Sequence, residues 1–215
     1  MLTLYFLPMS SSLATRIALR EAQLPAHYEE VDPVTGTTLH GGQPYGDVHE
    51  LRTVPALRTP EGTLLTENLA VLLYVCDRAE GRLGPVAGPE RYELIRWLSF
   101  VATELHARVF SHLLGGRRAA ELSEHVSKTV ERPLAYVESH LRRRDHLLDE
   151  FSVADAYLIT ALNWSRATPI SLEPYPGLRA YLARGLARPA VRESIAAEMP
   201  LFREEMKRVE AARRG

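Results

Sequence analysis

The sequence contains a single cysteine, Cys76, among 215 residues. One thiol cannot form an internal disulfide, and a cysteine-rich zinc site is excluded as well. The histidines show no metal-ligand spacing, so no metal is implied. No apolar stretch approaches the roughly 18 residues of a membrane-spanning helix, and the first residues lack the basic segment of a secretory signal. These absences predict a soluble, cytoplasmic protein without a membrane partner.

The chain also lacks an excess of either charge. It has 26 Lys and Arg residues against 27 Asp and Glu residues, a formal net charge of −1. Such a balance gives no general attraction for nucleic acid, so we expect no nucleic-acid partner. Hydrophobic residues make up 46% and charged residues 25%, which excludes disorder and indicates a globular protein.

The sequence pattern changes near residue 80. Before this point, short β-type runs alternate with segments of helical spacing, in the order β-α-β, a loop, then β-β-α. This order predicts an α+β domain with a mixed four-stranded sheet in a thioredoxin-like arrangement. The predicted strands span residues 2–7, 27–31, 54–57 and 63–65, the helices 11–23 and 68–79, and the loop 32–46.

After residue 80 the pattern contains no strand. Residues 81–88 are rich in Gly and Pro and are interpreted as a linker. Apolar residues then recur at helical spacing, which predicts an all-α domain over residues 89–215, following a first domain over residues 1–80. The predicted helices span residues 90–114, 118–143 with an interruption at Pro133, 152–167, 178–186, 190–197 and 201–212.

Seven blocks of the sequence resemble the cytosolic glutathione transferases, most closely the bacterial beta class. They are LYFLP at residues 4–8, SLA at 12–14, IALREA at 17–22, VPAL at 54–57, LTENLAV at 65–71, WLSFVATELH at 97–106 and FSVADAYL at 151–158. The resemblance implies an enzyme of detoxification that conjugates the thiolate of glutathione, its co-substrate, to small hydrophobic electrophiles. It also implies a homodimer.

Ser10, Ser11 and Ser12 follow the first predicted strand, where a helix begins. A helix N-terminus favours an anion, which here would be the glutathione thiolate. The resemblance places Ser11 at the position where the beta class usually has cysteine. Serine cannot form a mixed disulfide with glutathione, so conjugation is favoured over thiol–disulfide exchange. The alternative is that these serines only cap the helix.

Two further residues are catalytic candidates beside Ser11. Many family members use a tyrosine of the first strand to donate a hydrogen bond to the thiolate. Phe6 occupies the beta-class tyrosine position and Tyr5 precedes it; adjacent strand residues face opposite sides, so only one can face the site. Tyr5 could equally be a buried structural residue. The resemblance places His106 near the sulfur, and Ser99 and Thr103, one to two turns earlier, are expected to line the cleft.

The resemblance also implies which residues bind glutathione. Family members hold the proline that corresponds to Pro55 in the cis form, and the backbone of Val54 would contact the cysteinyl part of glutathione. Glu67 would pair with the α-ammonium group, and Asn68 with the following helix N-terminus would receive the α-carboxylate. Arg52 is the only basic candidate in residues 32–52 for the glycine carboxylate, which suggests altered or weaker binding.

Two other features have structural interpretations. Ser152 and Asp155 form a capping box before an apolar run, which is a folding signal. Cys76 lies in an apolar stripe and is expected to be buried and inert.

Two alternative functions stay open at this point. One is a protein of this fold that has lost catalysis and binds a protein partner, as the stringent starvation proteins do. The other is a glutathione-dependent isomerase or peroxidase. Glutathione affinity distinguishes the first alternative from an enzyme.

Overall fold

The computed structural model describes residues 1–114 and 119–214 and divides into two compact units. The first unit consists of Met1–Ala79 together with α8 (Pro189–Arg214), and the second of Glu80–Arg188. The expected helical domain of residues 89–215 therefore differs from the second unit at its C-terminal end. The residues expected to form a linker belong to the second unit, where Leu83 is buried and its carbonyl accepts the Val153 N–H at 3.0 Å.

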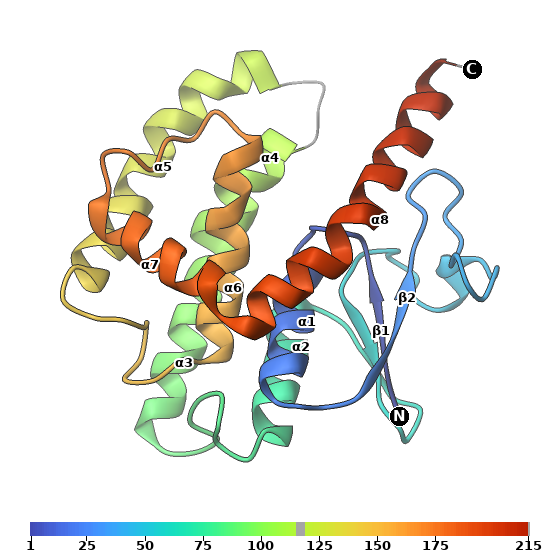
Figure 1. The fold of residues 1–215 in the computed structure, drawn as a ribbon, viewed down its shortest axis with the longest axis horizontal. Coiled ribbons are helices and arrows are strands. Elements are labelled where there is room, and N and C mark those ends of the chain that lie inside the picture. Colours follow the sequence, from blue (N-terminus) through green and yellow to red (C-terminus); the bar gives the residue numbers. More distant parts are fainter. Residues whose placement is uncertain (115–118, 215) are drawn as a thin grey trace. The chain divides into compact units, whose positions relative to one another are not determined.

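The first unit is built on a four-stranded sheet in the order β2-β1-β3-β4. Strand β1 (Leu2–Phe6) pairs in parallel with β2 (Ala26–Glu30) and antiparallel with β3 (Ala56–Arg58), which pairs antiparallel with β4 (Leu64–Leu65). The predicted mixed sheet is thus confirmed. Figure 1 shows α1 (Ser12–Glu21) and α2 (Asn68–Arg78) on the same side of this sheet.

The two faces of β1 are covered differently. Phe6 packs edge-on against Tyr28, and the Arg16 guanidinium of α1 lies 4.5 Å from its ring centre. Tyr5 points to the opposite face, in a buried cluster with Tyr45 of the short 3₁₀ helix η1 (Tyr45–Asp47). Val54 packs against this cluster. The alternation along β1 therefore places Tyr5, and not Phe6, on the side of Val54.

The second unit is helical. Its elements are α3 (Pro89–Phe100), η2 (Val101–Phe110), α4 (Ser111–Leu114), α5 (Ala119–Leu141), α6 (Val153–Asn163), the 3₁₀ helix η3 (Trp164–Ala167) and α7 (Pro176–Ala187). The single helix expected over residues 90–114 contains a π-helical segment, η2, in its middle. Pro133 lies inside α5 and does not end it, and the predicted helix start at Arg118 lies outside the described residues. The predicted capping box at Ser152 and Asp155 is confirmed.

Helix α8 corrects one expectation. The sequence predicted two short helices around Pro200, but α8 is one helix of 26 residues with Pro200 in its interior. It packs on α1, where the buried Arg16 and Glu198 form an ion pair at 2.6 Å. Beyond Pro200, Arg208 pairs with Glu30 of β2 at 2.6 Å. Contacts on both sides of the proline hold the helix in place and offset the backbone hydrogen bond that proline removes.

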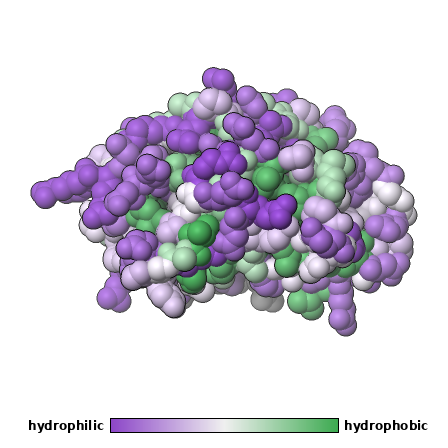
Figure 2. Space-filling model, turned by 90° about the horizontal axis from the view of Figure 1, so that it is seen from below, coloured by the Kyte–Doolittle hydropathy of each residue, from purple (hydrophilic) through white to green (hydrophobic). Residues whose placement is uncertain are grey.

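The surface is mainly hydrophilic in the view of Figure 2, where hydrophobic residues are scattered among polar ones. In residues 1–114 and 119–214, no helix combines the length and the apolar character needed to cross a bilayer. The same residues contain no group of three or more His, Cys, Asp or Glu side chains placed to hold a metal ion. Cys76 is buried, as expected.

One carboxyl group of α8 leads to a prediction about pH. Burial, followed by the negative charge of Glu30, raises the pKa of Glu205 to about 7 from 4.5. Between these two values the folded protein retains a proton that the unfolded chain releases, so stability falls as pH rises through this window. Glu205→Gln removes the ionisation. We expect the variant to gain about 1 kcal/mol at pH 8 and little at pH 5, after allowance for partial exposure.

Urea unfolding of the two proteins at both pH values measures this difference. Glu204→Gln is the matched control, because Glu204 is exposed and Lys207 lowers its pKa. An equal stability difference between Glu205→Gln and the unmodified protein at pH 5 and pH 8 would show that Glu205 does not titrate in this window.

Candidate functional site

Ser10 and Ser11 lie in the turn between β1 and α1, and Ser12 is the first residue of α1. Ser10 and Ser12 bond locally: their hydroxyl groups lie 2.7 Å apart, and each lies within hydrogen-bond distance of the Leu7 carbonyl. Ser11 is 6% exposed, and its hydroxyl donates to the Val54 carbonyl at 3.3 Å. Ser11 occupies the N-cap position of α1, yet its side chain makes no capping hydrogen bond. Capping alone therefore does not account for Ser11.

The segment before β3 approaches this turn. The Val54–Pro55 peptide bond is cis, which confirms that expectation. The Val54 carbonyl accepts the Ser11 hydroxyl, whereas the Val54 N–H has no hydrogen-bond partner among the residues that the structure describes. An unpaired N–H and a carbonyl of one residue can bind an extended peptide as an added strand.

The N-terminus of α2 is the third segment of the candidate site, after the serine turn and the segment before β3. Glu67 has φ +65° and ψ 116°, a conformation that costs a non-glycine residue about 1–3 kcal/mol and that concentrates at functional sites. Its carboxylate is exposed and forms no ion pair within the described part of the chain. Asn68 accepts the Thr15 hydroxyl through Oδ1 at 3.2 Å, whereas its Nδ2 is buried and has no acceptor. The helix end thus presents donors together with a free carboxylate.

Two side chains of the first unit border these segments. Tyr5 lies in the cluster that contacts Val54, and its hydroxyl forms no hydrogen bond with any residue described. Arg52 is exposed, with φ +55°, and no carboxylate pairs with its guanidinium in the described ranges. The structure therefore brings Ser11, Val54 and Tyr5 together. The guanidinium of Arg52, two residues before Val54, is not neutralised by any carboxylate of the described residues.

His106 belongs to the second unit and lies in the π-helical segment η2; such segments often occur at functional sites. Its Nδ1 is 2.6 Å from the Tyr157 hydroxyl, and its ring centre is 4.9 Å from that of Trp164. Burial lowers the pKa of His106 below 6.5, so the ring is neutral at pH 7. Nδ1 either donates to the Tyr157 oxygen or accepts the Tyr157 proton; in the second tautomer the ring hydrogen is on Nε2, which can then donate.

Ser99 and Thr103 lie one helical turn apart on the same face of the α3–η2 helix. The Thr103 hydroxyl donates to the Ser99 carbonyl at 3.0 Å, and the Thr103 side chain is exposed. Both precede His106 along α3 and η2.

The sequence did not predict which side chains contact Asn68 and His106. Thr15 holds Asn68, and Tyr157 with Trp164 fixes His106. Thr15 lies four positions after Ser11, which places both on one face of α1 and was an available signal. No sequence pattern relates position 106 to positions 157 and 164, because those residues meet only through tertiary packing.

Comparison with known proteins identifies the family. The model for the N-terminal domain of glutathione S-transferases matches residues 9–78, and the model for the C-terminal domain matches residues 120–184. The chain is 35% identical over 198 residues to glutathione S-transferase GstA of Escherichia coli O157:H7, which covers 91% of this chain and 98% of the relative. The chain therefore belongs to the glutathione S-transferase family.

Two solved structures show which glutathione S-transferases this chain is similar to. A bacterial beta-class glutathione S-transferase of Sphingomonas chungbukensis is 36% identical with a TM-score of 0.85, and a sphingomonad glutathione S-transferase solved with glutathione is 35% identical with a TM-score of 0.86. Each alignment covers 91% of this chain and 98% of the other. The predicted resemblance to the beta class and the predicted enzyme class are both confirmed.

Proposed function

We propose that this protein conjugates glutathione to small hydrophobic electrophiles. The glutathione thiol loses its proton to solvent, and the thiolate attacks an electrophilic carbon. A carbon–sulfur bond forms while the leaving group departs with the electrons of the broken bond. The relative solved with bound glutathione supports glutathione as the co-substrate.

The observation that carries this proposal is the set of unpaired groups around the Ser11–Val54 contact. The Val54 N–H would bind the cysteinyl part of glutathione, and the Asn68 amide with the α2 N-terminus would receive its α-carboxylate. The free Glu67 carboxylate would pair with the α-ammonium group. Arg52 would contact the glycine carboxylate. Each charged end of the tripeptide thus meets a group of opposite charge or a donor.

Ser11 would stabilise the thiolate. Its hydroxyl has one proton, which it donates to the Val54 carbonyl in this structure. Rotation about the Cα–Cβ bond would redirect that proton to the glutathione sulfur when the tripeptide takes over the Val54 carbonyl. The N-terminus of α1 favours the negative charge at the same place. Tyr5, whose hydroxyl is unpaired among the described residues, would be a second donor.

We assign His106, Ser99 and Thr103 to the electrophile side of the reaction. Neutral His106 would donate from Nε2 to the thiolate or to the electrophile, while Tyr157 fixes the ring through Nδ1. We also propose that the protein acts as a cytoplasmic homodimer, as the family resemblance implies.

Calorimetric titration with reduced glutathione tests the proposal, followed by an assay with the electrophile 1-chloro-2,4-dinitrobenzene. Binding together with conjugation supports it. If no heat is detected at millimolar glutathione at two temperatures, the proposed function is wrong and the partner-binding alternative gains support. The isomerase and peroxidase alternatives would bind glutathione but not conjugate this electrophile. The comparisons favour none of these alternatives.

Glu67→Gln provides a residue-level test of glutathione binding. The variant is expected to weaken glutathione affinity about tenfold, because the α-ammonium group loses its charged partner. Stability should change by less than about 0.5 kcal/mol, since Glu67 is exposed and its carboxylate is unpaired within the described residues. Glu61→Gln, at an exposed acid of the hairpin between β3 and β4, is the control. Equal affinities for all three proteins would remove the ammonium contact.

A further inference from the structure

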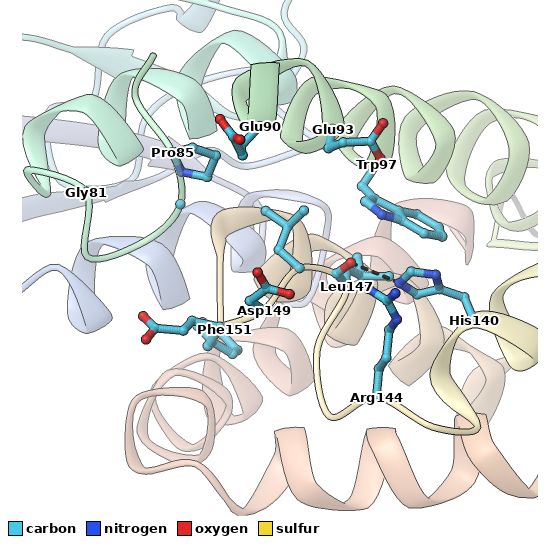
Figure 3. Close-up of a pocket in the computed structure, with 13 residues that line it drawn as sticks. Gly81, Pro85, Glu90, Glu93, Trp97, His140, Arg144, Leu147, Asp149 and Phe151 are labelled. Atoms are coloured by element: carbon cyan, nitrogen blue, oxygen red, sulfur yellow. Dashed lines mark hydrogen bonds between the residues drawn. The ribbon is translucent and has the colours of Figure 1, made fainter. Parts of the chain in front are cut away.

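The second unit contains a pocket that the proposed reaction does not use (Figure 3). Its volume is about 390 Å³, within the usual range of small-molecule sites. Four segments line it: residues 81–85, α3, the C-terminal end of α5 and the loop that follows α5. All of these residues lie within Glu80–Arg188, so the pocket is formed by one unit.

The inner wall of the pocket is aromatic and aliphatic. Trp97, Leu147 and Phe151 line it and are buried. The His140 ring centre lies 4.6 Å from that of Trp97. The Arg96 guanidinium stands 4.4 Å from the Trp97 ring centre, so this indole already accepts one cation. A wall of this kind suits an apolar body.

The outer wall is rich in carboxylates. Glu90, Asp149 and Glu150 line the pocket and form no ion pair with any residue in the described ranges, whereas Glu93 is paired with Arg96 at 2.7 Å. Figure 3 shows Glu90 and Asp149 on opposite sides of the pocket, from α3 and from the loop. The unpaired acids therefore add negative charge to the exposed part of the pocket lining.

The positive groups lie elsewhere in the pocket. Arg144 is the one Lys or Arg residue in its lining, and Figure 3 shows it beside His140, away from Glu90. His140 Nε2 donates to the Leu147 carbonyl at 2.9 Å, because a carbonyl can only accept. Burial lowers the pKa of His140, so its ring adds no charge at pH 7.

We propose that this pocket binds a small organic monocation, an amine that carries an aromatic or alkyl body. The body would pack against Trp97, Leu147 and Phe151, and the ammonium group would face Glu90 and Asp149. The site is separate from the residues assigned to conjugation. Trp97 and Ser99 are two positions apart and so point to nearly opposite sides of α3, and none of the proposed glutathione contacts lines the pocket.

Calorimetry with three ligands of similar shape tests the charge preference. The probes are 2-phenylethylamine, the neutral 2-phenylethanol and the anion 3-phenylpropionate, in low-salt buffer at pH 7 because salt screens exposed charges. We expect the amine to bind about tenfold more tightly than the alcohol, and the carboxylate to bind more weakly than either. If the amine does not bind at millimolar concentration, or binds no better than the alcohol, the proposal is wrong.

Variants of the exposed lining residues locate the site. The double variant Glu90→Gln with Asp149→Asn is expected to weaken amine binding about tenfold, and Arg144→Gln to strengthen it about twofold by removing a like charge. Asp145→Asn, an exposed acid outside the lining, should leave the affinity unchanged. Unaltered affinity in the double variant would overturn the assignment. Because binding of the amine is measured without glutathione, the result does not depend on the proposed function.

Discussion

Replacing Asp155 with alanine is expected to lower the free energy of unfolding by about 3–5 kcal/mol. The Asp155 carboxylate is fully buried and accepts hydrogen bonds from four donors: the Leu147 N–H, the Ser152 N–H, the Ser152 hydroxyl and the Tyr181 hydroxyl. Alanine would leave all of these donors without an acceptor inside the second unit. Because the bonds join α6, α7 and the loop after α5, their loss would loosen three segments together.

Thermal unfolding followed by circular dichroism measures the effect. A loss of this size corresponds to a fall of about 6–20 °C in a protein of this length. Asp145→Ala is the matched control, since Asp145 is exposed and, among the described residues, forms only a surface pair with Arg184; it should change stability by less than about 0.5 kcal/mol. If Asp155→Ala lowers the free energy of unfolding as little as the control does, water replaces the carboxylate as hydrogen-bond acceptor. The Asp155 hydrogen bonds would then contribute little to the stability of this unit.

Ser11→Ala is expected to slow glutathione conjugation by about one to two powers of ten, if Ser11 is the thiolate donor. The lost hydrogen bond would raise the pKa of the bound thiol, and each unit of pKa lowers the thiolate fraction about tenfold. Folding should be little affected, because the 3.3 Å bond to the Val54 carbonyl is long. The pH dependence of kcat/KM separates the two effects: the midpoint of its rise should move to higher pH.

Two further variants make this test specific. Ser10→Ala removes a neighbouring hydroxyl that bonds to the Leu7 carbonyl, and it should change the rate by no more than about threefold. Ser11→Cys should gain a mixed disulfide with glutathione, detectable by mass, because a thiol can take part in exchange. An unchanged rate and pH profile in Ser11→Ala would exclude Ser11 from the mechanism and transfer the role to Tyr5 or His106.

Much of the fold was predictable from the sequence because its signals are local. The β-type run over residues 2–7 and the helical spacing after the serine turn predicted β1 and α1, and the order of the elements predicted the mixed sheet. The Ser152–Asp155 spacing predicted the start of α6 within one residue. Each signal depends on residues that lie within one strand or one helical turn of each other.

The candidate site was predictable only in part. Ser11, Val54 and Glu67 were identified because each lies in a short block that resembles the family. The choice between Tyr5 and Phe6 could not be made, since a shift of one residue exchanges the two faces of a strand. The unpaired Asn68 Nδ2 could not be foreseen either, because it depends on Thr15, which lies 53 positions away and occupies the Oδ1 of the same amide.

The sequence by itself therefore determined the main strands and helices of residues 1–79, the family and the candidate residues for binding glutathione. Only the tertiary structure decided that α8 runs through Pro200 and joins the first unit, that Tyr5 lies beside Val54, and that His106 is fixed by Tyr157. The reason is the distance along the chain over which each kind of interaction acts. Backbone preferences and hydrophobic periodicity act over a few residues, whereas the ion pair that docks α8 joins Arg16 to Glu198, 182 positions apart, and forms only when the packed core brings the two together.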